Sequence, residues 1–317
     1  MKVLITGIAG FIGSNLAERC LREGWEVTGI DDFSNGHEEF IPNGVKLIKK
    51  DFASQDVETL ISSNHFDTVF HLAACPRVGY SVEQPFETNH NNVTKTLQLM
   101  DYCRGNINRF VFASSSAVYG NVEQLPTQED CNKNPQSPYG LQKLIIEQYL
   151  KVYNSLYGLE SVCLRFFNVF GKNQLGNSAY STAVSAWLNA INRNESMRSD
   201  GDGSQTRDMC HVNNVVEAMI LSAKSPKQLN ADVLNVACGS KTSNKEILEF
   251  LLSKYPDAKY HDAPWRPGDV MHTLADISKI GDVLGYKPVT EFWEGLEMTA
   301  QWYRENWELI SKLSLRI

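Results

Sequence analysis

Residues 3–13 read VLITGIAGFIG, an apolar run that is interrupted by three glycines, Gly7, Gly10 and Gly13. The run predicts a buried strand, and the residues after it have the pattern of an amphipathic helix. Glycines between a strand and a helix let backbone amides approach a pyrophosphate at the helix N-terminus. A glycine triplet alone is a weak signal, but this strand-turn-helix context indicates a dinucleotide site.

Two carboxylates end the next predicted strand, residues 25–31, at Asp31 and Asp32. A carboxylate at Asp31 can accept hydrogen bonds from both hydroxyls of an adenosine ribose and would repel a 2′-phosphate, which favours NAD. Asp51 and Phe52 end the third predicted strand and are expected to flank the adenine, although a simple strand end explains them nearly as well. Further residues that we place in the cofactor site are Phe11, Ile12, Asn35, Gly36, Leu72, Ala73, Ala74, Asn92, Tyr139 and Lys143.

Predicted strands and helices alternate as far as residue 168. The strands are expected at 3–6, 25–31, 45–50, 68–73, 109–114 and 161–167, and the helices at about 11–23, 55–62, 85–103 and 139–157. Such alternation predicts a parallel sheet with helices on both faces. We therefore predict an α/β fold with a Rossmann-type doubly wound sheet over residues 1–168, completed by a return segment near 211–240.

The regular alternation weakens after residue 168. Residues 171–178, GKNQLGNS, have the composition of a loop. Helices are expected near 181–191, 213–223, 245–252 and from 292, with a short strand near 232–236. We predict a smaller, irregular α/β domain that binds the substrate over residues 169–317.

The bulk composition excludes several classes of protein. The chain has 317 residues, a formal net charge of -7 and seven cysteines without a C-x-x-C motif. The acidic balance disfavours a nucleic-acid partner. Scattered cysteines indicate a reduced, cytoplasmic chain rather than a disulfide framework, and no metal site is expected. We expect no membrane partner because no apolar stretch reaches about 18 residues, and the glycines argue against a signal peptide.

Tyr139 and Lys143 share one face of a predicted helix. In that arrangement the ammonium can lower the pKa of the phenol from about 10 toward neutrality. An ionised Tyr139 could then accept a proton from a substrate hydroxyl. Tyr and Lys also meet at this spacing by chance on solvated helices, but Pro138 just before the helix and a serine-rich strand end upstream favour catalysis.

The serine-rich strand end comprises Ser114, Ser115 and Ser116. Ligands of parallel sheets bind beyond the carboxyl ends of the strands, which is also where the glycine turn lies. A hydroxyl there can relay a proton between the substrate and Tyr139. The predicted catalytic residues are Ser115, Ser116, Tyr139 and Lys143.

Eight motifs together resemble the extended short-chain dehydrogenases that act on nucleotide sugars. They are LITGIAGFIGSNLA (4–17), DDFSNG (31–36), FHLAA (70–74), FASSSAVYG (112–120), SPYGLQK (137–143), LRFFNVFG (164–171), GDGSQTRDMCHV (201–212) and WRPGDVMHTLADISK (265–279). The resemblance runs from about residue 2 to Pro288. It is greatest to NAD-dependent UDP-hexose 4-epimerases, particularly the branch that acts on N-acetylated sugars.

The resemblance implies roles for individual residues. Tyr139 matches the base that takes the proton from the sugar O4, Ser115 the hydroxyl that bonds O4, and Lys143 the contact to the nicotinamide ribose. The substrate implied is a UDP-sugar, and guanidinium forks suit its diphosphate. The residues implied to bind the diphosphate are Asn168, Arg207 and Arg266. The family also implies a homodimer formed through the helices at 85–103 and 139–157.

Departures from related enzymes narrow the expected reaction. Ser116 and Ala117 stand where similar 4,6-dehydratases have an acid pair, and UDP-glucuronate decarboxylases usually have a glutamate at the Ala117 position. A plain epimerase needs neither group. Thr273 stands where a large tyrosine restricts the C2 substituent, so a small side chain implies room for an N-acetyl group. The resemblance therefore implies reversible C4 epimerisation of UDP-N-acetylglucosamine and UDP-N-acetylgalactosamine, with UDP-glucose and UDP-galactose also accepted.

Alternative functions remain open from the sequence. The chain could act on another nucleotide sugar, such as a uronate, or could be a reductase that releases NADH. A non-catalytic NAD-sensing module is a third possibility, although intact Ser115, Tyr139 and Lys143 argue against it. Arg77 either approaches the nicotinamide or sugar or is a surface arginine, and His71 is expected to be a packed core histidine.

Overall fold

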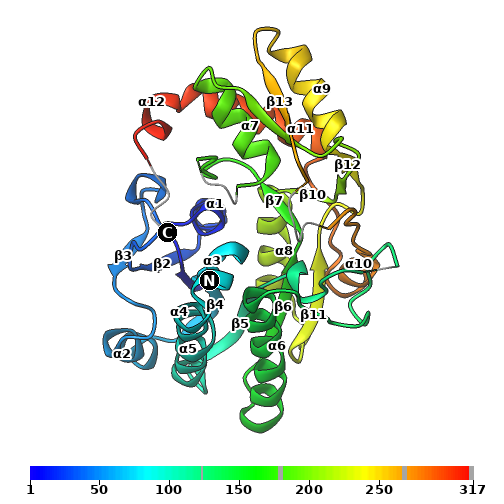
Figure 1. Ribbon diagram of the computed structural model, residues 1–317. Coiled ribbons are helices and arrows are strands. Elements are labelled where there is room, and N and C mark those ends of the chain that lie inside the picture. The colour runs from blue at the N-terminus through cyan, green and yellow to red at the C-terminus, as the bar shows by residue number, and fades with distance from the viewer. Residues whose placement is uncertain (123, 178–180, 266–269, 314–317) are drawn as a thin grey trace.

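A seven-stranded parallel sheet forms the centre of the molecule in this computed structural model, which describes residues 1–317 except 123, 178–180, 266–269 and 314–317 (Figure 1). The strand order is β11-β6-β5-β4-β1-β2-β3. These strands are β1 (Lys2–Thr6), β2 (Glu26–Asp31), β3 (Lys46–Lys49), β4 (Phe66–His71), β5 (Ile107–Ser115), β6 (Ser161–Phe166) and β11 (Asp232–Val236). All neighbours run parallel, which confirms the predicted Rossmann-type α/β fold.

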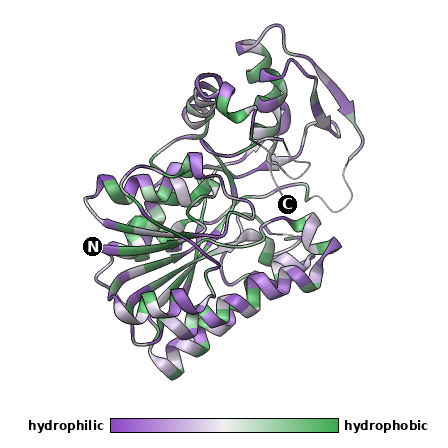
Figure 2. Ribbon diagram, turned by 90° about the vertical axis from the view of Figure 1, so that its left-hand side faces the viewer, coloured by the Kyte–Doolittle hydropathy of each residue, from purple (hydrophilic) through white to green (hydrophobic). Residues whose placement is uncertain are grey.

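Helices cover both faces of the sheet. On one face lie α1 (Phe11–Arg22), α8 (Val212–Lys224) and α10 (Ser278–Leu284), and on the other α2 (Gln55–Ser63), α5 (Lys95–Cys103) and α6 (Pro138–Tyr157). Successive strand residues point to opposite faces, so Val3 and Ile5 join one core and Leu4 the other. In Figure 2 the flanking helices alternate between hydrophobic and hydrophilic residues along their length, which is typical of helices with one buried face.

The predicted long helix at 85–103 contains a change of helical type. It consists of α4 (Pro85–Asn89), a π-helical turn η2 (His90–Thr94) and α5. A short helix that the sequence did not predict, α3 (Val78–Glu83), precedes it and packs on α6. The π turn is a local insertion in the hydrogen-bond ladder, which hydrophobic periodicity does not reveal.

A further hydrophobic core lies beside the sheet, among the helices in the upper part of Figure 1. It is centred on buried Trp187, Leu251, Leu296 and Tyr303. The helices that contribute to it are α7 (Ala183–Asn192), α9 (Asn244–Lys254), α11 (Phe292–Glu305) and α12 (Trp307–Ile310). The accompanying two-stranded pairs are β7 (Asn168–Phe170) with β10 (Met209–His211), β9 (Thr206–Arg207) with β12 (Thr242–Ser243), and β8 (Met197–Asp200) with β13 (Tyr260–Ala263). Two short 3₁₀ turns complete the elements, η1 (Glu38–Phe40) and η3 (Ser116–Val118).

The chain returns to the main sheet after β10. Helix α8 packs against α1, and β11 pairs in parallel with β6 from Asp232 opposite Val162 to Val236 opposite Phe166. The division into a cofactor domain at 1–168 and a substrate domain at 169–317 stays a prediction. Among the described residues, no helix combines the length and apolar character needed to cross a membrane.

Candidate active site

A cleft of about 1780 Å³ opens where the central strands end at their carboxyl edge. Its lining includes the glycine turn after β1, the end of β2, the loop after β4 and the last residues of β5 and β6. Residues from α7 and β8 line its other side. The cleft therefore joins the predicted cofactor site to the region that we predicted to bind substrate.

The glycine turn is a close-packed cradle. Gly7 has φ 73° and donates its N–H to the Ile30 carbonyl at 2.9 Å. A Cβ on Gly7 would lie 2.7 Å from the Ala73 nitrogen, and a Cβ on Gly13 would lie 2.1 Å from the Gly7 oxygen. Because those contacts are with backbone atoms, no side chain fits at either position. The turn leads directly into α1, so amides are exposed at a helix N-terminus.

Asp31 lies at the end of β2 and lines the cleft. Its carboxylate accepts backbone N–H bonds from Ala9 and from Phe33, each at 2.9 Å. Burial raises the pKa of this carboxyl, and the two N–H donors oppose the shift. A carboxylate has about four acceptor sites, so Asp31 retains capacity for ribose hydroxyls.

Most of the other predicted cofactor residues also line the cleft. They are Gly10, Phe11, Ile12, Asp32, Asn35, Gly36, Phe52, Leu72, Ala73 and Ala74. Asp51 and Asn92 are not among its lining residues. Asp51 instead forms an ion pair with Lys95 at 2.7 Å. The Asn92 amide accepts from the Cys75 N–H at 2.7 Å and donates to Gln142 at 2.7 Å, so it holds the loop after β4 rather than facing the cleft.

Tyr139 and Lys143 line the cleft from the first turns of α6. The helix begins at Pro138, capped by Ser137, whose hydroxyl accepts the Gly140 N–H at 3.2 Å. The Ser115 side chain lies beside the Tyr139 phenol and lowers its pKa. The Lys143 ammonium lies 5.7 Å from the centre of the Tyr139 ring and donates to the Ala113 carbonyl at 2.7 Å. The structure thus brings together three of the four predicted catalytic residues.

The neighbouring serines have other partners. The Ser114 hydroxyl donates to Glu147 at 2.5 Å and is buried. Ser116 starts the turn η3, where its carbonyl accepts the Tyr119 N–H at 3.0 Å, and it is not a lining residue of the cleft. A direct part for Ser116 in catalysis therefore stays a prediction without support from its position.

The protonation of the reacting pair differs from the sequence-based expectation. Burial raises the pKa of Tyr139 to about 12, and the Ser115 hydrogen bond opposes that shift. Burial also lowers the pKa of Lys143 to about 8, with Glu147 opposing. The expected fall of the Tyr139 pKa toward neutrality therefore stays a prediction. Desolvation raises the pKa of the Tyr139 phenol by more than the nearby Lys143 ammonium lowers it, because that ammonium donates its hydrogen bond to the Ala113 carbonyl.

Two of the predicted substrate residues lie near the pairing of β7 with β10. Asn168 and Arg207 both line it. The Asn168 amide donates to the Thr273 hydroxyl at 3.1 Å, and the same hydroxyl accepts the Asp208 N–H at 3.1 Å. Thr273 is not among the lining residues, so its hydroxyl orients the Asn168 side chain without lining the cleft itself. Arg266 lies outside the described residues.

Comparison with known proteins decides the family. Residues 3–237 match the model of the NAD dependent epimerase/dehydratase family. The chain belongs to this family. The match spans the glycine cradle, Ser115, Tyr139, Lys143 and Asn168, and it confirms the family predicted from the sequence.

Individual members of the epimerase/dehydratase family are similar over nearly the whole chain. A UDP-N-acetylglucosamine 4-epimerase from Methanobrevibacter ruminantium, solved with UDP-N-acetylmuramic acid, is 37% identical with a TM-score of 0.90, covering 96% of this chain and 98% of that chain. A UDP-glucose 4-epimerase from Corynebacterium glutamicum is 34% identical over 91% of both chains. A UDP-glucuronic acid 4-epimerase from Bacillus cereus, solved with UDP-glucuronic acid and NAD, is 29% identical with a TM-score of 0.87, covering 96% of this chain and 99% of that chain.

The residues present fit the NAD that the family uses. The Gly7–Gly13 cradle leaves backbone amides without side-chain cover at the start of α1, and Asp31 supplies a carboxylate at the end of β2. Lys143 has donors left beyond its bond to Ala113, since an ammonium has three. These residues would hold the diphosphate, the adenosine ribose and the nicotinamide ribose respectively. The predicted cofactor is confirmed as NAD.

Sequence analysis missed several residues of this epimerase/dehydratase site. Arg193 and Arg198 also line the cleft, and neither falls in a motif that would single it out. Arg77, left open from the sequence, lines the cleft as well. His71 is the packed histidine that we expected, since its ring nitrogens lie 2.7 Å from the Thr6 hydroxyl and 2.9 Å from the Thr96 hydroxyl. Among the residues that the structure describes, no group of three His, Cys, Asp or Glu side chains could hold a metal ion.

Proposed function

We propose that this NAD-dependent UDP-sugar 4-epimerase prefers UDP-N-acetylglucosamine and UDP-N-acetylgalactosamine and also accepts UDP-glucose and UDP-galactose. The observation that carries the reaction is that Tyr139 and Lys143 line a cleft that also contains the glycine cradle, with Ser115 beside the Tyr139 phenol. The preference for N-acetylated sugars is supported by the likeness to the Methanobrevibacter ruminantium enzyme.

Tyr139 is the base of the proposed reaction. Its phenol, hydrogen-bonded to Ser115, takes the proton from the sugar O4 and later returns it. The Ser115 oxygen accepts the Ala117 N–H at 3.2 Å, which leaves its own proton free to donate toward the phenol oxygen. Bound NAD supplies the hydride acceptor for C4 and the hydride donor for the opposite face of the resulting 4-keto sugar.

The anchoring of the nucleotide allows the sugar to turn over between the two halves of the reaction. We assign the diphosphate to Asn168 and Arg207, which line the cleft, and to Arg266. A guanidinium fork binds phosphate oxygens in pairs, so the nucleotide stays bound while the sugar rotates. No external oxidant is needed because the cofactor is regenerated in each cycle.

The decisive experiment is proton NMR of the purified protein with UDP-N-acetylglucosamine, and then with UDP-glucose, without added NAD. Anomeric signals of the 4-epimer would establish epimerisation and retained cofactor together. The ratio of the two rates tests the preference for N-acetylated sugars. No reaction of either sugar, even after addition of NAD, would contradict the proposal.

A uronate is the second candidate substrate, because Arg77 brings a cation into the cleft next to the loop after β4. The likeness to the Bacillus cereus enzyme supports testing it. Faster turnover of UDP-glucuronate than of both neutral sugars would establish this alternative. Accumulation of NADH absorbance would instead indicate a reductase, and NAD binding without any turnover would indicate a sensing module.

We further propose that the protein is a cytoplasmic homodimer without a nucleic-acid partner. Exposed apolar side chains on α3, α4 and α6, including Val82, Phe86 and Leu156, support the dimer. Exposed apolar patches of this kind mark association surfaces. The reduced state of all seven cysteines agrees with a reducing compartment.

A further inference from the structure

Three successive turns of α6 contact three consecutive residues at the end of β5. Tyr139 lies beside the Ser115 side chain, which lowers its pKa, and Lys143 donates to the Ala113 carbonyl at 2.7 Å. One turn further along α6, Glu147 accepts from the Ser114 hydroxyl at 2.5 Å. The first two contacts belong to the proposed reacting centre, and the third fixes the strand between them. Glu147 is therefore joined directly to the segment that carries Ser115.

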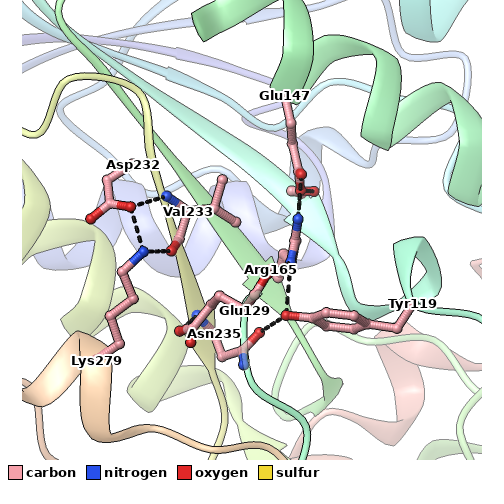
Figure 3. A network of polar contacts seen from close by, with 9 residues as sticks. Tyr119, Glu129, Glu147, Arg165, Asp232, Val233, Asn235 and Lys279 are labelled. Atoms are coloured by element: carbon pink, nitrogen blue, oxygen red, sulfur yellow. Dashed lines mark hydrogen bonds and ion pairs between the residues drawn. The ribbon is translucent and has the colours of Figure 1, made fainter. Parts of the chain in front are cut away.

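Glu147 is itself held rigidly from β6. Its two oxygens accept hydrogen bonds from Nε and Nη2 of the Arg165 guanidinium, at 2.9 and 2.6 Å, and both side chains are buried. Arg165 also donates to the Tyr119 hydroxyl at 2.8 Å, and Tyr119 donates to Asn235 on β11 at 2.6 Å (Figure 3). A buried carboxylate with all its partners fixed cannot shift without leaving a charge unpaired.

Glu147 also acts on the buried ammonium of Lys143 through its charge. The ionisable groups that face Lys143 are Tyr139 and Glu147 on α6, His71 on β4 and Cys75 on the loop after β4. His71 is neutral because burial and Lys143 lower its pKa to about 3, and burial raises the pKa of the Cys75 thiol. Glu147, which is ion-paired with Arg165, supplies the negative charge of this group. It opposes the desolvation that lowers the pKa of Lys143 to about 8.

We propose that Glu147 is a positioning residue for the epimerisation, fixing the end of β5 against α6 and keeping the Lys143 ammonium charged beside Tyr139. The proposal rests on the proposed function. Glu147 does not line the cleft, so it acts through Ser114 and Lys143 rather than on the substrate. We expect Glu147 to affect catalysis in two separable ways. The first is geometric and is transmitted by the hydrogen bond from the Ser114 hydroxyl, and the second is electrostatic and acts on the Lys143 ammonium.

The charge effect is tested by Glu147→Gln, which keeps an oxygen for Ser114 and removes the negative charge. In protein labelled with [ε-¹³C]lysine, the pKa of Lys143 should fall by about one unit, with the signal assigned through Lys143→Arg. The kcat for UDP-N-acetylglucosamine should fall about tenfold at pH 8 while KM changes less than about threefold. The decline of kcat on the alkaline side should move to lower pH.

The geometric effect is tested by Ser114→Ala, which removes the hydroxyl and leaves the Arg165–Glu147 ion pair intact. We expect kcat to fall several-fold with the pKa of Lys143 unchanged. If Glu147→Gln does not fold, Glu147→Gln combined with Arg165→Met removes both charges and leaves neither unpaired. The double variant should show the same fall in the pKa of Lys143.

The matched control is Glu160→Gln. Glu160 pairs with Arg109 at 3.3 Å near the opposite end of β5, so it tests the loss of a half-buried ion pair far from Tyr139. The control should keep the wild-type pH profile and the wild-type pKa of Lys143.

If the wild-type enzyme epimerises UDP-sugars and Glu147→Gln matches it in kcat, pH profile and Lys143 pKa, Glu147 is structural only and the proposal is wrong. If the wild-type enzyme turns over no UDP-sugar, the proposed function fails, while the Lys143 titration still decides the charge effect.

Discussion

The Asn168 amide donates to the Thr273 hydroxyl at 3.1 Å, which joins the start of β7 to a segment 105 residues further along the chain. The same hydroxyl accepts the N–H of Asp208, the residue after Arg207. Thr273 therefore ties the Asn168 side chain to the backbone that directly follows Arg207. Its role in the structure is to orient Asn168, in addition to any effect of its size on the sugar.

Thr273→Val should raise KM for UDP-N-acetylglucosamine about 3- to 10-fold, because it removes one acceptor shared by two donors. The kcat should change less than about twofold, since the Thr273 hydroxyl bonds to Asn168 and Asp208 and to none of the proposed reacting groups. Steady-state kinetics measures both parameters. Thr273→Ser keeps the acceptor and should behave as wild type, and an unchanged KM for the valine variant would refute the bridging role.

Gly7→Ala should abolish NAD retention for two reasons. The new Cβ would lie 2.7 Å from the Ala73 nitrogen, and the position has a positive φ that alanine rarely adopts. Gly24→Ala is the matched control, since Gly24 has nearly the same φ, 74°, with nothing within 4 Å of a new Cβ. The control should lose only about 1 kcal/mol of unfolding free energy and keep its cofactor. Bound NAD is measured in the supernatant after denaturation, and equal retention by both variants would contradict the cradle.

Tyr139→Phe should lower kcat by about 10²- to 10⁴-fold, because it removes the proton acceptor and keeps the ring. NAD content should be unchanged, since the phenol oxygen contributes little binding compared with the cradle. Tyr149→Phe on the same helix is the control, because Tyr149 is exposed. A Tyr139→Phe enzyme with wild-type turnover would exclude Tyr139 as the base.

Acidification should destabilise the fold through two buried histidines. Burial lowers the pKa of His71 to about 3 and that of His211 to about 4, both from an ordinary value of 6.5. Below pH 6.5 both histidines are protonated in the unfolded chain, whereas they stay neutral in the native protein. Each histidine therefore lowers the unfolding free energy by about 1.4 kcal/mol for every pH unit of acidification. Asp208 acts oppositely, because burial raises its pKa from 3.8 to about 6 and the native carboxyl holds a proton that the unfolded chain releases.

The net effect of these three groups between pH 6 and pH 4 is a loss of about 1.4 kcal/mol per pH unit. Urea denaturation across this range measures the slope. His71→Asn should remove one of the two histidine contributions and flatten the slope, whatever its effect on absolute stability. A wild-type stability that does not fall on acidification would show that the histidines bind protons in the native state.

Phe86→Asp should convert the proposed dimer to a monomer. The Phe86 side chain is 87% exposed on α4 and Leu156 is 66% exposed on α6, exposures that a monomer would not favour for two such large apolar groups. Burying a charge in the interface would disfavour association. Light scattering after gel filtration measures the mass. A matched substitution outside this surface, Met298→Asp, should leave the mass unchanged.

Local patterns were sufficient to predict the sheet and the cofactor, and they brought Tyr139 and Lys143 together at the cleft. The glycine turn and Tyr139–Lys143 are short-range signals, because each depends on spacing within one turn or one helix. The Arg165–Glu147 pair was not predicted, since it joins β6 to α6 and neither residue is unusual in its own segment. The bonds of Asn92 to Cys75 and Gln142 were not predicted either, because they join the π turn η2 to distant segments.

The state of Tyr139 also could not be predicted from spacing. A lysine one helical turn away suggests a lowered pKa for the Tyr139 phenol. In the structure, however, the Lys143 ammonium donates to the Ala113 carbonyl and the phenol is buried. Desolvation depends on what packs around a group, and that information is spread over the whole chain. The position of Thr273 behind Asn168 is of the same kind, since it depends on the pairing of distant segments.

The pairing of β11 with β6 has a consequence for how the protein is made. Until Val236 has left the ribosome, β6 is the edge of the growing sheet, with unpaired backbone groups and the buried side chain of Arg165 next to the gap. An open edge of this kind can pair with another chain. Synthesis that stalls between β6 and β11 would therefore leave a nascent chain prone to aggregation, and a gene split at residue 168 would give a fragment with the same exposed edge.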